Sequence, residues 1–121
     1  MIWKDVKGYE GSYEISSTGL VKSLKRLDTV GRLVNEKILK AGVNERGYKV
    51  VVLRKDNKSK TRKVHQLVAE SFLNHKPCGL KLVVDHIDND KLNNNVENLQ
   101  LLTNGENISK GYKTKRNGNI N

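Results

Sequence analysis

The first 30 residues carry short runs of alternating apolar and polar side chains, and glycines separate these runs. Tyr13 and Ile15 alternate with polar neighbours, which is the period of a half-buried β-strand. Residues 17–19, Ser-Thr-Gly, have the composition of a turn, and Leu20–Lys25 has that of a second strand. We therefore predict a small β-hairpin or meander at the N-terminus.

The clearest strand signal lies further along the chain, from Gly47 to Arg54, where valines cluster between polar ends. Lys55–Lys58 is a polar turn, and Ser59–Val64 has the length to return as the partner strand. Residues 31–46 have weak periodicity, so we expect a connector there with one short strand near Ile38.

Residues 64–73 show the period of an amphipathic helix. The apolar positions fall at i, i+3, i+4 and i+8 and form one stripe: Val64, Leu67, Val68 and Phe72. Pro77 and Gly79 prevent its continuation. His65 lies in the first turn and off the stripe, which predicts a surface or phosphate-facing histidine rather than a metal ligand.

The next pattern is a strand, a polar loop and a returning strand. Leu82–Val84 is an apolar run that leads directly into Asp85 and His86. The loop, residues 87–97, is rich in Asn and Asp, which tolerate turn geometry. Asn98–Leu102 then has the pattern of an antiparallel return strand, so an acid and a base lie where the first strand ends.

A helix start follows that second strand. Residues 103–106, Thr-Asn-Gly-Glu, match a capping box with Thr103 as N-cap, which places Asn107 near the first turn of a helix. Residues 110–121 form a basic tail rich in Gly and Asn. We expect this tail either to lie along DNA or to remain disordered.

Composition limits the class of protein. The 121 residues are 36% hydrophobic and 5% aromatic, which suits one domain with a modest core, or a small domain with an arm. No apolar run approaches the roughly 20 residues of a membrane helix, and the N-terminus lacks a secretory signal pattern. Cys78 is a single cysteine, which excludes an intramolecular disulfide and a multi-cysteine zinc site. The cytoplasm or the nucleoid is therefore the expected compartment.

Charge is the most informative part of the composition, because it is distributed unevenly. Residues 1–63 hold 16 Lys and Arg against 7 Asp and Glu, residues 64–109 hold 3 against 6, and residues 110–121 hold 4 against none. An acidic centre between basic segments is what a metal-dependent nuclease needs, since carboxylates bind the cation and cations bind phosphates. Charge by itself is equally typical of a basic, ribosomal-type binding protein.

Lysine and arginine side chains follow the predicted strands. A two-stranded ribbon fits the major groove of B-DNA, and phosphate contacts would make its affinity sensitive to salt. The alternative is a solvated strand face without a partner. The candidate DNA-binding residues are Lys22, Lys25, Arg26, Lys49, Arg54, Lys60 and Arg62.

The stretch VVDHIDNDKLNNNVENLQLLTNGEN, residues 83–107, resembles the HNH endonucleases, and more closely their phage and intron-encoded homing members. Residues 2–26 resemble the nuclease-associated modular domain often found at the N-terminus of those enzymes. The segment VHQLVAESF, residues 64–72, resembles the family's sequence just before the nuclease motif. Together these stretches cover most of the chain in the family's order.

The resemblance implies a role for each residue of the motif. Asp85 matches the carboxylate ligand of one divalent cation, and Asn107 matches the last motif position, which gives the second ligand and is often His. His86 matches the general base that takes a proton from water, and free imidazole titrates near pH 6.5. Asn98 matches the Asn that orients this base. An Asp and an Asn oxygen favour Mg²⁺ or Mn²⁺ over Zn²⁺.

The resemblance also implies a fold and a domain organisation. We expect an α+β protein in which an N-terminal β-hairpin or meander arm precedes a ββα-metal nuclease finger. The expected divisions are an N-terminal nuclease-associated module over residues 1–46, a nuclease domain over residues 47–109 and the basic tail over residues 110–121.

The implied function is metal-dependent hydrolysis of a DNA phosphodiester bond, with one strand nicked per active site. The expected partner is double-stranded DNA, with no membrane, and the protein is either a monomer or a homodimer. One alternative is a non-catalytic DNA-binding protein derived from an HNH nuclease. Another is an RNA-associated basic protein, which the scarcity of aromatic residues for base stacking disfavours.

Overall fold

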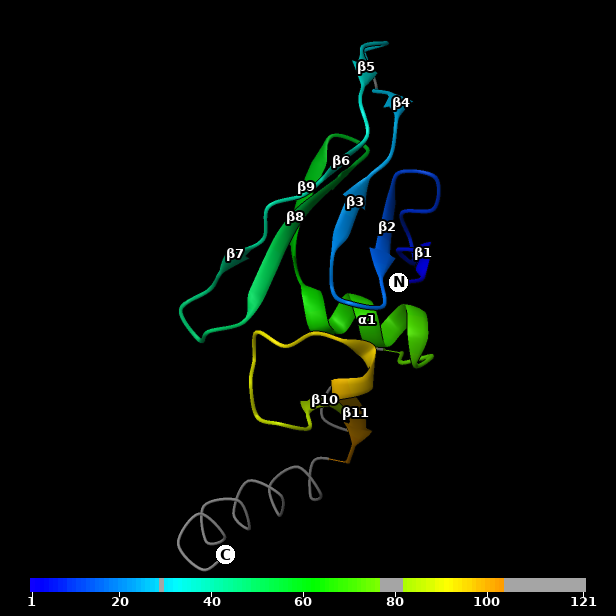
Figure 1. The fold of residues 1–121 in the computed structure, drawn as a ribbon. Helices are drawn as coiled ribbons and strands as arrows, with labels where there is room; N and C mark the ends of the chain where they lie inside the picture. The colour runs from blue at the N-terminus through cyan, green and yellow to red at the C-terminus, as the bar shows by residue number, and fades with distance from the viewer. Residues whose placement is uncertain (29, 77–81, 104–121) are drawn as a thin grey trace, which may run out of the picture.

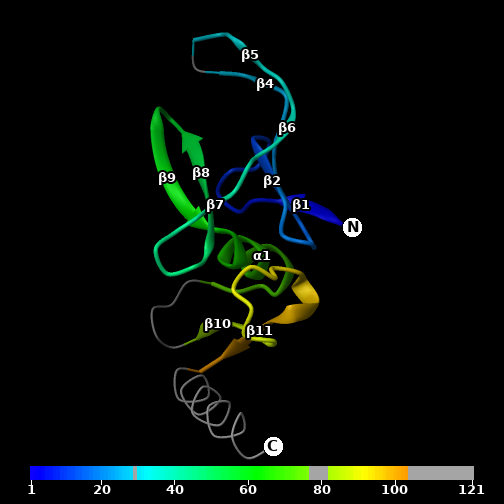
Figure 2. The same cartoon turned by 60° about the vertical axis from the view of Figure 1, so that its left-hand side comes forward.

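The computed structural model describes residues 1–28, 30–76 and 82–103. In these ranges the chain alternates short strands with one α-helix and one 3-10 helix, which makes it an α+β fold as expected. Figures 1 and 2 place the helix α1 (Val64–Phe72) centrally. The N-terminal strands lie on one side of it, and the strand pair β10 (Val83–His86) and β11 (Leu99–Leu102) lies on the other.

The N-terminal arm is an antiparallel sheet in the order β1-β2-β3-β6. Its strands are β1 (Trp3–Asp5), β2 (Tyr13–Ser16), β3 (Val21–Ser23) and β6 (Lys37–Ile38). Between β3 and β6 the chain leaves the sheet as a separate hairpin, seen at the top of Figure 1, of β4 (Arg26–Leu27) and β5 (Leu33–Val34). The predicted meander and the short strand near Ile38 are confirmed, whereas β1, β4 and β5 were not expected.

A second sheet contains the predicted basic hairpin. Its antiparallel strands are β7 (Gly42–Val43), β8 (Lys49–Lys55) and β9 (Lys58–Lys63). The turn between β8 and β9 has Asp56 at φ 52° and Asn57 at φ 63°. Two consecutive positive φ values give a tight turn whose twist matches the strands, and Asp and Asn tolerate this conformation better than most residues do. The hairpin prediction is confirmed.

The helix α1 begins directly after β9 and ends where Asn74 adopts φ 55°. The backbone N–H of His75 donates to the Ala69 carbonyl at 3.1 Å, which satisfies a carbonyl at the helix end. Of the predicted apolar stripe, Val64, Leu67 and Val68 are buried and Phe72 is partly buried. No helix in the described part of the chain is long and apolar enough to cross a membrane.

One hydrophobic core joins the N-terminal arm to the rest of the chain. The arm contributes four of the buried side chains of this core, and β8, α1 and β11 contribute the others. The members are Val6, Tyr13, Ile15, Val21, Val51, Leu53, Val64, Leu67, Val68 and Leu99. The arm and the segment that follows it therefore bury their apolar surface against each other.

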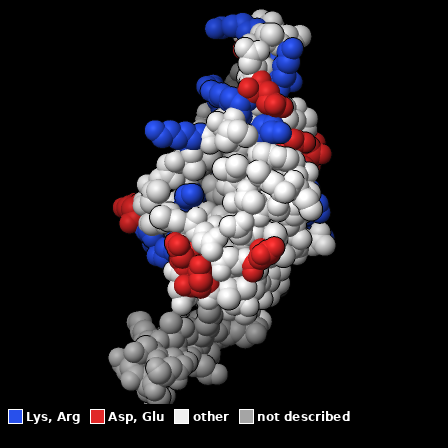
Figure 3. Space-filling view, in the orientation of Figure 1, with Lys and Arg blue, Asp and Glu red and all other residues white. Residues whose placement is uncertain are grey.

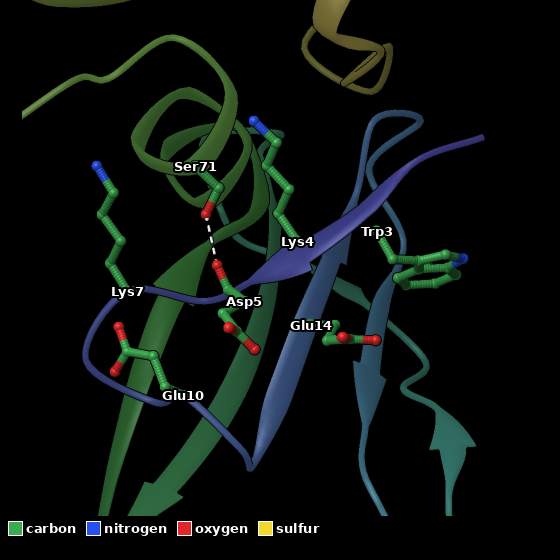
Figure 4. A pocket seen from close by; sticks show the side chains of 7 residues that line it. All are labelled: Trp3, Lys4, Asp5, Lys7, Glu10, Glu14 and Ser71. Atoms are coloured by element: carbon green, nitrogen blue, oxygen red, sulfur yellow. Dashed lines mark hydrogen bonds between the residues drawn. The ribbon is translucent and has the colours of Figure 1, made fainter.

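Hydrogen bonds reinforce this shared core. The Ser71 hydroxyl of α1 donates to the Asp5 carbonyl at 2.9 Å, as the dashed line in Figure 4 shows. The Arg54 backbone N–H donates to the Tyr13 hydroxyl at 3.1 Å. The hollow in Figure 4 is lined by side chains of both charges and by none of the predicted catalytic residues. Its lining is Trp3, Lys4, Asp5, Lys7, Glu10, Glu14 and Ser71.

The predicted strand-loop-strand unit is present, with two differences in its bounds. β10 pairs antiparallel with β11 through the register Asp85↔Gln100 and His86↔Leu99, so the strand continues through the acid and the base. Asn98 lies in the 3-10 helix η1 (Val96–Asn98), one residue before β11 begins. The predicted helix after Thr103 lies outside the described residues.

Candidate functional site

His86 occupies the last position of β10 and is buried, with 6% of its surface exposed. Its partner across the ladder, Leu99, belongs to the hydrophobic core, which fixes the end of the strand. The ring Nε2 of His86 lies 2.8 Å from the amide Oδ1 of Asn94. The residue predicted to be the general base is thus held by a strand ladder and by a buried side-chain hydrogen bond.

Two other rings pack around His86. The centroid of the His65 ring, on α1, lies 5.1 Å from that of His86 and 4.9 Å from that of Tyr48. Tyr48, directly before β8, lies 6.1 Å from His86, and the two rings are stacked. Three segments that are distant in sequence therefore meet at one imidazole.

The expectation that His65 lies at the surface is wrong. α1 packs against the N-terminal sheet and also against β10 and β11, so a position off its apolar stripe is still covered. His65 is 4% exposed. Burial lowers the pKa of His65 to about 3, and the charges of His86, Lys63 and His75 act in the same direction. His65 is consequently a neutral ring at ordinary pH.

Asp85 precedes His86 on β10 and is half-buried. Its Oδ2 accepts a hydrogen bond of 2.8 Å from the Gln100 side-chain amide, directly across the ladder. This bond fixes the carboxylate against β11. Adjacent strand residues alternate between faces, which agrees with the different burial of Asp85 and His86.

Asn98 closes the loop of residues 87–97. Its Nδ2 donates to Asp88 Oδ1 at 2.8 Å and to the Asn93 carbonyl at 2.9 Å. Its Oδ1 accepts from the Asp88 backbone N–H at 3.1 Å. Asn98 was predicted to orient His86. These hydrogen bonds connect Asn98 to the loop, so its influence on His86 would pass through the loop.

Asp88 is the centre of this loop's hydrogen bonds. It accepts from the Asn93 amide at 2.9 Å and from the Asp90 backbone N–H at 2.7 Å, besides the Asn98 amide. These bonds, that from Asn93 first, hold the pKa of the exposed Asp88 carboxyl below its usual range. Asp88 therefore carries a negative charge at neutral pH, the form that accepts these hydrogen bonds.

Asn94 is the residue that the sequence did not single out. It lies in the middle of three consecutive asparagines, and only folding distinguishes it from Asn93 and Asn95. Its side chain is 3% exposed and contacts His86, whereas Asn93 and Asn95 hydrogen-bond to each other at 3.0 Å near the surface. No signal in the sequence gives this assignment.

The predicted second metal ligand, Asn107, lies outside the described residues. Among the residues that are described, no three His, Cys, Asp or Glu side chains gather into a group that could hold a metal ion. The predicted ligand pair, the Asp85 carboxylate and the Asn107 amide, is smaller than such a group. Of these two predicted metal ligands, Asp85 is the one whose surroundings the structure describes.

Three of the predicted DNA-binding cations are engaged within the fold. Lys22 Nζ lies 4.1 Å from the centroid of the Trp3 ring. The Arg26 guanidinium donates to Ser23 Oγ at 2.9 Å and also to two backbone carbonyls. Arg62 forms a largely buried ion pair with Glu70 of α1. Their contacts with DNA remain predictions, and each such contact would compete with the internal partner named above.

The other predicted cations are more accessible. Lys25, Arg54 and Lys60 are exposed, and Lys49 is half-buried. In Figure 3, Lys and Arg side chains, with a few acidic ones, gather over the upper part of the molecule, where β4–β6 and the β8–β9 hairpin lie. Acidic groups lie lower, over the loop of residues 87–97. The charge separation noted in the sequence thus persists on this face.

Fold and site together define an α+β protein in which a basic β-arm packs on a helix and a two-stranded finger carries an Asp-His pair. Comparison with known families agrees with this description. A family model described as the NUMOD4 motif matches residues 1–54, and one described as HNH endonuclease matches residues 62–108. These two matches confirm the resemblance to the HNH homing endonucleases drawn from the motif.

Individual relatives are found in phages and a giant virus. DNA endonuclease I-HmuI of Bacillus phage SP01 is 43% identical over 108 residues, which are 89% of this chain and 56% of the relative. An uncharacterised HNH endonuclease of Acanthamoeba polyphaga mimivirus is 38% identical over 88% of this chain and 25% of its own length. The chain thus spans about half, or less, of these relatives.

A solved structure is also similar. It concerns DNA binding and cleavage by the HNH homing endonuclease I-HmuI, and it matches with a TM-score of 0.77 and 39% identity. The match covers 95% of this chain and 60% of that one. The arm and the finger therefore resemble the solved relative in arrangement as well as in sequence. The division after residue 46 remains a prediction.

Proposed function

We propose that this chain is a metal-dependent DNA endonuclease that hydrolyses a phosphodiester bond. The observation that carries the proposal is the adjacent pair Asp85 and His86 in β10, with the carboxylate half-buried and the imidazole buried among other rings. HNH endonucleases generally use a divalent metal, and relatives named as endonucleases match most of this chain. These similarities support the activity.

In the proposed reaction, His86 removes a proton from the attacking water. Asp85 and Asn107 hold one divalent cation, and Asn98 keeps the loop in the shape that presents His86. The Asp85 carboxylate suits Mg²⁺ or Mn²⁺, because it is a hard oxygen donor already oriented by Gln100. A cation bound there would stabilise negative charge on the phosphate and on the leaving oxygen.

The proposed substrate is double-stranded DNA. The exposed cations Lys25, Arg54 and Lys60 lie on the arm and on the β8–β9 hairpin, where their side chains would be accessible to a phosphate backbone. Lys22, Arg26, Lys49 and Arg62 are proposed as weaker contacts. One active site per chain would nick a single strand, and a homodimer would cut both. The site of action would be the cytoplasm of a bacterial or infected cell.

Cleavage of supercoiled plasmid tests this proposal. The protein is incubated with plasmid in Mg²⁺, in Mn²⁺ and in chelator, and nicked and linear products are separated on a gel. We expect nicked circles with either metal and none with chelator. His86→Ala should abolish nicking while DNA binding, measured by fluorescence anisotropy, is retained.

Two outcomes would contradict the proposal. Binding that chelator does not change, with no nicked product after long incubation, would identify a non-catalytic DNA-binding protein derived from an HNH nuclease. Loss of both binding and cleavage in folded His86→Ala would argue against His86 acting as a base. Circular dichroism of the variant confirms that it is folded.

A further inference from the structure

The turn between β2 and β3 lies unusually close to the loop of residues 87–97. Gly19 has φ 89°, and a Cβ placed there would lie 2.8 Å from the Asn94 Cβ and 3.2 Å from its carbonyl oxygen. Real Cβ atoms essentially never come within 3.0 Å of another heavy atom. Two residues away, the Val96 backbone N–H donates to the Ser17 carbonyl at 2.8 Å. The arm and the finger loop therefore meet at Asn94 and, two residues further on, at Val96.

The turn itself is held firmly. Ser16 is 0% exposed, and its Oγ accepts from the backbone N–H of Leu20 at 2.9 Å and of Thr18 at 3.2 Å. The Gly19 N–H donates to the Ser16 carbonyl at 3.1 Å. A turn fixed from within can act as a rigid surface for whatever packs on it. Asn94 packs on it.

Asn94 connects this turn to His86. Its Oδ1 lies 2.8 Å from His86 Nε2, and both side chains are buried. An amide oxygen only accepts, so this orientation of the Asn94 amide assigns the ring proton to Nε2. In the neutral imidazole the lone pair that accepts a proton then lies on Nδ1. Asn94 thus specifies which nitrogen acts as the base.

We propose that Asn94 is a positioning residue for His86, and that the β2–β3 turn of the N-terminal arm fixes Asn94 through Gly19 and Ser17. The inference rests on the proposed endonuclease function for its effect on cleavage. It makes the arm a structural part of the catalytic site in addition to a DNA-binding element. A chain with a displaced turn would bind DNA normally and cleave it slowly.

Gly19→Ala tests the contact, and Gly8→Ala is its matched control. Both glycines have positive φ, 89° and 86°, but a Cβ at Gly8 would meet nothing within 4 Å. The two variants therefore share the backbone strain and differ in the crowding of Asn94. We expect Gly19→Ala to lower kcat about tenfold or more with little change in KM, and Gly8→Ala to remain within about twofold of the parent.

Substitutions at Asn94 test the hydrogen bond separately, which matters if Gly19→Ala does not fold. Asn94→Ala removes the acceptor, and Asn94→Asp retains one. We expect Asn94→Ala to lose kcat and Asn94→Asp to recover part of it. ¹⁵N NMR of the His86 ring gives a readout without DNA: the parent should show the Nε2–H form, and Asn94→Ala should shift the ring toward a mixture of both tautomers.

The outcomes separate this inference from the proposed function. Parent-like kcat in Gly19→Ala and Asn94→Ala would overturn it, as would equal losses of DNA affinity and of kcat in Gly19→Ala. If the parent cleaves no DNA with any metal, the proposed function fails, while the NMR comparison still tests Asn94. A parent ring protonated on Nδ1 would overturn the positioning role.

Discussion

Burial of His65 and His86 side by side is the main feature at the scale of single residues. Two imidazoles whose centroids lie 5.1 Å apart would repel each other if both were charged. The buried position of His65 keeps its ring neutral, with a pKa of about 3. His86 therefore has an uncharged neighbour at pH values where a general base must work.

This neutral His65 has a measurable effect on stability. Below pH 6.5 the unfolded chain binds a proton at His65 that the folded chain does not bind until about pH 3, so acid favours the unfolded state. We expect the free energy of unfolding to fall by up to about 1.4 kcal/mol per pH unit below that point. Urea unfolding between about pH 7 and pH 5, above the range of most carboxyls, measures the slope.

His65→Phe is the control for this slope, because it retains a ring beside Tyr48 and His86 and removes the titration. The variant should lose most of the slope. An unchanged slope in His65→Phe would assign the acid sensitivity to other groups.

At the residue scale, the sequence predicted the acid and the base of the site but did not predict the contacts that hold them. Asp85 and His86 are adjacent in sequence and lie at the end of an apolar run, so their pairing is visible without a fold. Asn94 and Tyr48 reach His86 only because the loop closes and because β8 begins beside α1. Contacts of that kind depend on three-dimensional closure, which local patterns do not encode.

At the scale of elements, long patterns were predictable, whereas among the two-residue strands of the described ranges β6, near Ile38, was expected and β4, β5 and β7 were not. The helix at 64–72 and the β8–β9 hairpin each extend over enough residues for a period to emerge. The two-residue strands β4 and β5 contain no full period, and pairing with each other defines them. Asn98 was assigned to a strand because the 3-10 turn before β11 has no sequence signature of its own.

Strand β9 supplies a prediction with an internal control. Arg62 and Lys60 are two positions apart, and both were predicted to bind DNA, but Arg62 pairs with Glu70 whereas Lys60 is exposed. Arg62→Ala leaves the 6%-exposed Glu70 without this partner, and we expect a loss of about 3 kcal/mol in the free energy of unfolding. Lys60→Ala should change it by less than about 0.5 kcal/mol.

DNA binding should show the opposite ranking. Lys60→Ala should reduce the slope of log affinity against log salt by about 1, because one phosphate contact is lost. Chemical denaturation and fluorescence anisotropy at several salt concentrations measure both effects. An unchanged stability in Arg62→Ala, together with a reduced salt slope, would show that Arg62 faces DNA and not Glu70.

At the scale of the whole molecule, the two family matches meet in one core. Val6, Tyr13, Ile15 and Val21 of the arm pack with α1 and with Leu99 of the finger. The order of the two modules was visible in the sequence. Their common core was not, because apolar residues in two separate patterns do not reveal which of them will touch.

A substitution in the arm should therefore destabilise the finger. Ile15 is 0% exposed, and Ile15→Ala should cost about 2–5 kcal/mol and lower the amide protection of β10 and β11 together with that of β2. Hydrogen exchange followed by mass spectrometry gives both regions in one experiment. Leu33→Ala is the control, since Leu33 is 56% exposed on β5 and should change little.

Preserved protection in the finger of Ile15→Ala would contradict this expectation. It would show that the arm and the finger unfold independently despite their contact.

The β4–β5 hairpin lies outside this shared core, with Leu27 at 68% and Leu33 at 56% exposure. Both ends of the hairpin return to the same sheet, at β3 and β6, and in Figure 1 β4 and β5 project away from the described part of that core. For protein engineering, this makes the hairpin the natural insertion point for a foreign recognition loop. Exchange of the entire arm, by contrast, would also replace the β2–β3 turn against which Asn94 packs.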